Sequence, residues 1–472
     1  MNVKYDKLKN ALPESVKNQI IPIELLSIIY VYIPKILTNL NIHETITDYL
    51  SDDKNIKQQI KAKYGKINNW DVSQVTNMKY LFFNYKNFNE DISNWDVSNV
   101  TNMEAMFQEA RSFDQPLSNW NVSNIVNMEA MFQEARSFNQ PLSNWNVSNV
   151  TNMNNLFYNC TNFNEDISNW NVSNVKNMAC MFQFAKCFDQ PLNKWNTSNV
   201  ISMQGMFNIA ESFNQSIYNW NVSNVTNMNG MFLHAYNFNQ PLNNWDVSNV
   251  KEVNSMFCHA YNFNQPLNNW DVSNIKDMGG TFCMSDSFNQ PLNDWNVSNV
   301  TNMASMFNLA INFNQPLSDW NISNVKKMSN MFDNAKVFNQ PLNNWDVSNV
   351  KHMDCMFFGA ETFNQPLNSW DVSNIQMQDM RNIFLWAISF HNSNNYEITM
   401  KDWIKRNDEK IARCRDALTA SNAVVAALEE KVKIELTKLN ANKEIVATLE
   451  EKLKIELTKL NANNENVAAL KH

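Results

Sequence analysis

The chain has 472 residues, of which 44% are hydrophobic and only 18% are charged, and its formal net charge is −8. This apolar content is ample for a packed interior, while the low charge leaves most of the polar surface to uncharged side chains. The acidic balance provides no basic face to displace counterions from phosphate, which argues against binding of nucleic acid or of an anionic membrane surface.

Residues 1–66 are Lys-rich and apolar and lack the repeat that follows them. Their beginning is not typical of a signal peptide, and the apolar run 20–33 contains Glu24 and is too short to span a bilayer. No lipidation motif is evident, and the seven cysteines form no CxxC pair, which favours a reducing compartment. We therefore expect an intracellular protein.

The segment 21–34, IPIELLSIIYVYIP, predicts a helix, because a first turn tolerates Pro22 and Pro34 ends the helix. It resembles the opening helix of an F-box. That resemblance implies docking on the adaptor subunit of an SCF-type ubiquitin ligase, and thus a substrate receptor, through the following residues: Pro22, Glu24, Leu25, Leu26 and Ile29. The alternative is a plain N-terminal helix that seals the first repeat.

Tryptophans mark a period of 25 residues along the middle of the chain. Thirteen of them, from Trp70 to Trp370, are separated by twelve identical steps without insertion or deletion. A unit of this size cannot bury its apolar face alone, so the pattern predicts stacked units, a solenoid over 67–392. We expect the Trp side chains to form its core, among them Trp95, Trp120, Trp145, Trp170, Trp220, Trp245 and Trp270.

The unit that begins at Trp95 is WDVSNVTNMEAMFQEARSFDQPLSN. Trp95 and Val97 alternate with polar residues, which predicts a short strand. Apolar residues then recur at i, i+3, i+4 and i+7 within 103–110, which predicts a short helix. The segment 113–116 contains a proline and predicts a turn. Each unit is thus expected to contribute one strand, to a parallel ladder, and one helix on the opposite side.

Two kinds of surface position are distinguished by comparing the units. Asn recurs four residues after each Trp from Trp95 onward, as at Asn99 and Asn124, and we expect these amides to satisfy backbone groups of the turns. Positions 13, 14, 16 and 17 after each Trp vary widely, as in 108–112 and 233–237. We expect this variable flank to select a partner.

The string WDVSNVTNMxxMFxxAxxFNQPLN resembles the repeat of BspA-like leucine-rich-repeat surface proteins, which occurs in mycoplasma-type lipoproteins and also in large DNA viruses. The resemblance covers about 67–392. It implies an α/β, leucine-rich-repeat-like solenoid that acts as a protein-binding scaffold. A surface or adhesion protein is an alternative that the same resemblance implies.

No arrangement of residues predicts catalysis or a cofactor. Serine is dominated by one repeat position, and the six glycines form no phosphate-binding loop. One weak metal candidate exists: His234 and His259 share a position in adjacent units, and Cys258 and Cys283 share the preceding position. Four such ligands suit zinc only if they converge. Since consecutive helical residues point about 100° apart, we expect no metal here.

The last unit departs from the pattern. Its Met and Phe positions fall two residues late, at Met380 and Phe384, which predicts an insertion and a C-terminal cap. We expect Trp386, Phe390 and His391 to close the array.

Residues 398–472 contain neither Pro nor Gly, and a 21-residue sequence beginning at Leu428 recurs from Leu449. Because 21 residues are three heptads, the pattern predicts a helical, coiled-coil-prone tail. Its seam would contain Leu428, Val432, Leu439, Leu449, Leu453 and Leu460. We expect a homodimer through this tail; the alternative is an amphipathic helix that folds back on its own solenoid.

Overall fold

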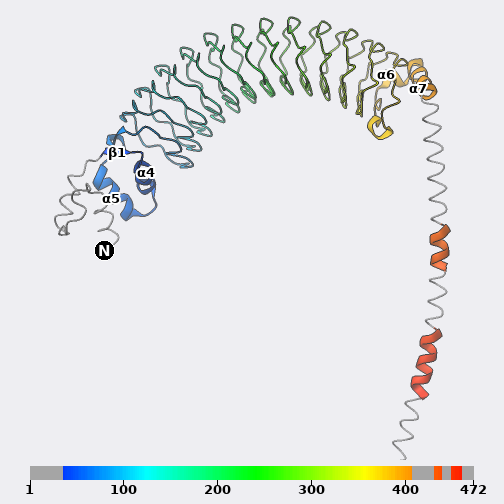
Figure 1. Ribbon diagram of the computed structural model, residues 1–472, viewed down its shortest axis with the longest axis horizontal. Coiled ribbons are helices and arrows are strands. Elements are labelled where there is room, and N and C mark those ends of the chain that lie inside the picture. The colour runs from blue at the N-terminus through cyan, green and yellow to red at the C-terminus, as the bar shows by residue number, and fades with distance from the viewer. Residues whose placement is uncertain (1–35, 407–429, 438–447, 460–472) are drawn as a thin grey trace, which may run out of the picture. The chain divides into compact units, whose positions relative to one another are not determined.

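The computed structural model describes residues 36–406, 430–437 and 448–459, which fall into two compact units divided between Asp402 and Trp403. In the first unit the 25-residue repeats, here called rungs, follow one another in a single row (Figure 1). In the second, residues 430–437 and 448–459 are helical. No helix of the described ranges is long and apolar enough to cross a membrane. The F-box-like segment and the seam residues Leu428, Leu439 and Leu460 lie outside the described residues.

Regular elements stand almost entirely at the two ends of the array. Before it come β1 (Ile36–Thr38), α4 (Ile42–Leu50), α5 (Lys54–Tyr64), η1 (Ile67–Asn69) and β2 (Asp71–Gln74), and after it come η2 (Met377–Met380), α6 (Ile388–His391) and α7 (Asn394–Arg406). β1 pairs in parallel with β2 and so adds a partial rung before the first complete one. The α4 side chain Tyr49 contacts the Trp70 ring edge-on at 5.1 Å and covers this end of the Trp column.

Apart from β2 in the first of them, the rungs contain neither the predicted strand nor the predicted helix. Parallel pairing between rungs is reduced to isolated bridges seven residues after each Trp, from Asn77–Asn102 to Lys327–His352. The segment 103–110 is a run of turns in which Ala105 and Glu109 have φ values of 53° and 59°. Left-handed residues cannot belong to a right-handed helix. The prediction of one strand and one helix per rung is therefore wrong.

Hydrogen bonds between rungs take the place of those within a helix. Four N–H groups of one rung donate to four carbonyls of the next at 2.7–3.1 Å: Met103 to Asn127, Ala105 to Glu129, Phe107 to Met131, and Glu109 to Gln133. We call this segment, residues 102–110 and its equivalents, the turn ladder. Residues 103, 106, 107 and 110 are all buried in this backbone. Their inward direction is what made the sequence pattern resemble a helix.

The core consists of aromatic and Met columns that run along the array. Trp145 and Trp170 stack with ring centroids 6.3 Å apart, and Phe107 and Phe132 stack at 5.5 Å. Each indole N–H is also satisfied, as where Trp145 donates to the Leu117 carbonyl at 3.0 Å. Burial of the Trp side chains is nearly complete, with exposed fractions of 0–4% from Trp70 to Trp370.

The Asn residues four after each Trp satisfy turn carbonyls of the preceding rung. Asn99 Nδ2 donates to the Ser73 carbonyl at 2.9 Å, and Asn124 Nδ2 donates to that of Ser98 at 2.8 Å. The same bond recurs in the later rungs, as from Asn374 to Ser348 at 3.1 Å. These amides thus join each rung to the one before it, through a turn that lies a few residues ahead of the turn ladder.

The last rung shows the two-residue insertion directly. Met353 N–H donates to the Asp379 carbonyl, 26 residues later, whereas Met103 donates to Asn127, 24 residues later. Phe390 is fully buried and contacts Phe363, so it closes the Phe columns. Trp386 is 64% exposed, because it lies in the final turn ladder with no rung to cover it. The expectation that Trp386 closes the array is therefore wrong.

Candidate functional site

Two positions in every rung have a left-handed backbone. They lie ten and fourteen residues after the Trp, or twelve and sixteen in the last rung with its insertion, and their φ values are between 53° and 64°. At the first of them Gly and other small residues predominate, as at Ala105 and Gly205. At the second, large side chains are common, although a Cβ disfavours this conformation and a β-branched residue such as Ile209 is worst suited to it.

Six successive rungs place a large side chain at this second position. We call them the apolar stripe: Phe184, Ile209, His234, His259, Met284 and Leu309. Each is half-buried, because the residues of neighbouring rungs stand beside it. Tyr158 lengthens the stripe by contacting Phe184 edge-on at 5.4 Å. The four earlier rungs have polar residues at the same position, so the stripe has a definite beginning; these residues are Asn84, Glu109, Glu134 and Asn159.

Two histidines and two tyrosines form the centre of the stripe. The rings of His234 and His259 stack with centroids 4.1 Å apart, and those of Tyr236 and Tyr261 stack at 5.1 Å. The Tyr261 hydroxyl lies 3.0 Å from His259 Nδ1, and the Tyr236 hydroxyl lies 3.4 Å from His234 Nδ1. Burial lowers the pKa of both imidazoles; His234 lowers that of His259 further, while Glu211 acts to raise that of His234. Burial therefore favours neutral rings that accept at Nδ1 from tyrosine.

The cysteines of the weak metal candidate interact with each other rather than with the histidines. A hydrogen bond between their side chains raises the pKa of the Cys258 thiol and lowers that of the Cys283 thiol. Among the described residues, no group of three or more His, Cys, Asp or Glu side chains is arranged to hold a metal ion. His234, His259, Cys258 and Cys283 thus form two adjacent pairs and not one ligand set.

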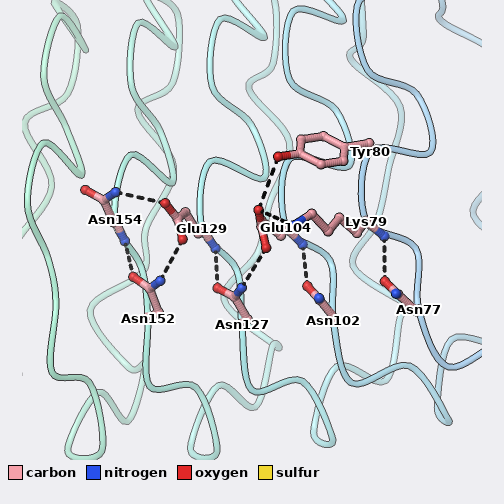
Figure 2. Close-up of polar contacts among 9 residues, drawn as sticks. All are labelled: Asn77, Lys79, Tyr80, Asn102, Glu104, Asn127, Glu129, Asn152 and Asn154. Atoms are coloured by element: carbon pink, nitrogen blue, oxygen red, sulfur yellow. Dashed lines mark hydrogen bonds and ion pairs between the residues drawn. The ribbon is translucent and has the colours of Figure 1, made fainter.

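The turn ladder on the N-terminal side of the stripe carries a polar network (Figure 2). Glu104 lies 2.7 Å from Lys79 Nζ and accepts from Asn127 Nδ2 at 3.2 Å. Glu129 accepts from Asn152 Nδ2 at 2.9 Å. Because donors of the chain itself already engage both carboxylates, this surface provides no free pair of carboxylates for acid–base chemistry.

A hollow of about 680 Å³ lies beside α5, lined in part by Lys61, Glu90 and Asp91. Glu90 accepts from the Tyr49 hydroxyl at 2.5 Å, and this contact, after burial, raises the pKa of Tyr49. Asp91 accepts from Asn68 Nδ2 at 2.8 Å. The carboxylates of this hollow are therefore occupied in holding the cap to the first rungs.

The sequence analysis identifies the surface positions at which the apolar stripe lies, but it does not identify the run of large side chains there. The sequence shows that positions 13, 14, 16 and 17 after each Trp vary, and its period places His234 beside His259. The run of large side chains at Phe184, Ile209, Met284 and Leu309 was missed. It becomes visible when the fourteenth residue after every Trp is compared down the array, since polar residues then give way to large ones.

The chain matches the family described as "Mycoplasma protein of unknown function, DUF285" over residues 52–168, 142–240, 185–295, 212–320 and 283–397. It belongs to this family. The overlapping stretches cover nearly all of the array, which confirms the repeat family that the sequence resembles. They begin after the F-box-like segment and give that resemblance no support.

Two solved structures show a weak likeness. One is the crystal structure of a TLR13–ssRNA13 complex, with 14% identity and a TM-score of 0.23 over 67% of this chain and 47% of that chain. The other is the Toll–Spatzle complex from Drosophila, with 12% identity and a TM-score of 0.21 over 68% and 45%. The chain spans about half the length of either protein, and likeness at this level carries no argument. No curated protein matches the chain.

Proposed function

We propose that the chain is a non-enzymatic scaffold that binds another protein along the turn ladder, centred on the apolar stripe. The observation that carries the proposal is the run of six large side chains at left-handed positions in successive rungs. A left-handed backbone costs roughly 1–2 kcal/mol per non-Gly residue. Gly or Asn at these positions would avoid part of that cost, and strained positions of this kind gather at functional sites.

The composition of the stripe fits a protein partner with apolar side chains. Phe184, Met284 and Leu309 provide deformable apolar surface, and Tyr236 and Tyr261 add hydroxyls at its centre. Aromatic residues and Met are enriched, and Lys and Glu depleted, in the cores of protein interfaces. The rungs before the stripe carry Asn or Glu at the same position, so an apolar partner segment is expected to end where the stripe begins.

A random peptide library selected against the intact chain tests the proposal. We expect the selected peptides to be rich in aromatic and aliphatic residues. They should bind the double variant Ile209→Asn/Leu309→Asn at least tenfold more weakly, because each Asn removes apolar contact while tolerating the backbone. Glu109→Asn, at the same position of a rung outside the stripe, is the matched control and should bind as the parent does. Equal affinity of the peptides for the double variant and the parent would refute the proposal.

A further inference from the structure

The turn ladder is directional. In each interior rung the N–H groups of alternate residues donate to the following rung, as where Met103 donates to Asn127, and the carbonyls between them accept from the preceding rung, as where Met78 donates to Asn102. The other N–H groups, such as that of Met106, donate within their own rung. The two ends of the array must therefore differ. Carbonyls are left over in the first rung and N–H groups in the last.

Both sets of groups are unpaired in the part of the chain that the structure describes. In the first rung four carbonyls accept no hydrogen bond from any described residue, namely those of Asn77, Lys79, Leu81 and Phe83. In the last rung the N–H groups of Asn382 and Trp386 donate to none. Their counterparts one rung further in, Cys355 and Gly359, donate to Arg381 and Leu385 at 2.9 and 2.8 Å.

Among the described residues, the end caps cover the core columns but not the turn ladder. At the first rung, Asn39 Oδ1 accepts from Thr76 and Asn77 N–H at 2.9 and 3.1 Å, next to the Tyr49–Trp70 contact. In the turn ladder of the same rung, which begins at Asn77, Tyr80 and Phe83 are 46% and 42% exposed.

At the last rung, Phe390 covers the Phe columns, while Leu385 and Trp386 are 43% and 64% exposed. Leu385 occupies the position of its rung that Phe83 occupies in the first, once the two-residue insertion is counted. Apolar side chains are thus exposed at matching positions at both ends.

We propose that a second copy of the chain stacks head to tail on this open edge, with the N–H groups of Asn382 and Trp386 donating to the first-rung carbonyls of the next copy. An ordinary β-strand is a poor occupant, because its edge alternates donors and acceptors. The first-rung edge offers acceptors alone, and the last rung of this chain presents donors alone at the same spacing. Leu385 would then lie over Tyr80, as Gln183 of an interior rung lies beside Gly205 of the next, and Trp386 would lie over Asn84, as His234 lies over His259.

The two mating surfaces are different, so each junction leaves one open end of each kind. Contacts of this type do not close on themselves as an isologous dimer does, and the copies form an open series. Unpaired edges are the sites at which chains add to one another. The interaction uses neither the apolar stripe nor the C-terminal tail.

Sedimentation of the intact chain tests the proposal. All chains would carry Leu453→Asp, which places a charge on the exposed tail seam and removes pairing through it. We expect the parent to sediment as a concentration-dependent series that extends beyond two copies. Phe83→Asp blocks the acceptor end and Leu385→Asp blocks the donor end, so each alone should remain monomeric. Val337→Asp, which alters a side chain 38% exposed in an interior rung, is the matched control and should keep the series.

Mixing the two blocked variants is the decisive measurement. Each supplies the end that the other lacks, so the mixture should form one junction and stop at a pair with twice the mass of either variant. A parent that stays monomeric at every concentration would overturn the proposal. So would a series that persists in either blocked variant, or a mixture that forms no pair.

Discussion

The imidazole rings of His234 and His259 lie nearly parallel in successive rungs, with centroids 4.1 Å apart and planes inclined by 21°. Each Nδ1 faces a tyrosine hydroxyl, and both side chains are half-buried. Protonation would place two positive charges against each other in a partly desolvated stack. The centre of the apolar stripe therefore requires neutral imidazoles.

This stack predicts a loss of stability in mild acid. Burial holds the folded-state pKa of both histidines below the usual 6.5. As the pH falls through 6.5 the unfolded chain takes up protons that the folded chain does not, so stability present above that pH is lost below it. We expect a lower melting temperature at pH 5.5 than at pH 7.5, and a smaller difference in His234→Asn/His259→Asn. The prediction fails if the double variant melts with the parent's pH dependence.

A second prediction concerns the Trp column. Trp220 stacks between Trp195 and Trp245 at 6.2 and 6.4 Å, and its Nε1 donates to Leu192 at 2.9 Å. Trp220→Ala opens a large cavity and should lower the free energy of unfolding by about 3–5 kcal/mol. Trp386→Ala, at a mostly exposed ring, should change it by no more than about 0.5 kcal/mol. Urea denaturation of the two variants measures both values, and equal losses would mean that the column does not hold the rungs together.

A third prediction tests the strain in the stripe. Ile209 has a φ of 59°, whereas Ile201 is 49% exposed and is not among the residues with positive φ. Gly adopts positive φ freely but weakens ordinary backbone by about 0.5–1 kcal/mol. We therefore expect Ile209→Gly to be neutral or stabilising and Ile201→Gly to be destabilising, as measured by thermal unfolding. Destabilisation by the same amount at both positions would show that Ile209 is held without strain.

The sequence predicts the array well, because identical rungs place like residues together. Trp and Phe columns follow from the 25-residue period alone, whatever the backbone between them. The predicted backbone path within a rung is wrong, because the turns of 103–110 bury the same side chains that a helix would bury. A sign of the true path was present: four of the six glycines fall at left-handed positions of the turn ladder, namely Gly205, Gly230, Gly280 and Gly359.

The candidate site was harder to predict than the array. Adjacent rungs bring His234 to His259 because they share a position, and that much follows from the period. Whether Cys258 joins them depends on the directions of two consecutive side chains, which the backbone between rungs decides. Large residues at a left-handed position are also unexpected from local propensity, and function is the reason we infer for them.

The last prediction concerns the tail. Residues 430–437 and 448–459 are helical, and Val432, Leu449 and Leu453 are 62%, 57% and 63% exposed. An apolar seam that recurs after 21 residues keeps its phase in a two-stranded coiled coil. In the Phe83→Asp background, where end-to-end stacking is blocked, we expect a weak dimer in sedimentation. The changes Val432→Asp and Leu453→Asp together should give a monomer, because each puts a charge in the seam. Glu450→Ala, which leaves the seam intact, should keep the dimer. If the background chain and the double variant sediment alike as monomers, the coiled coil is wrong and packing of the tail on its own chain is favoured.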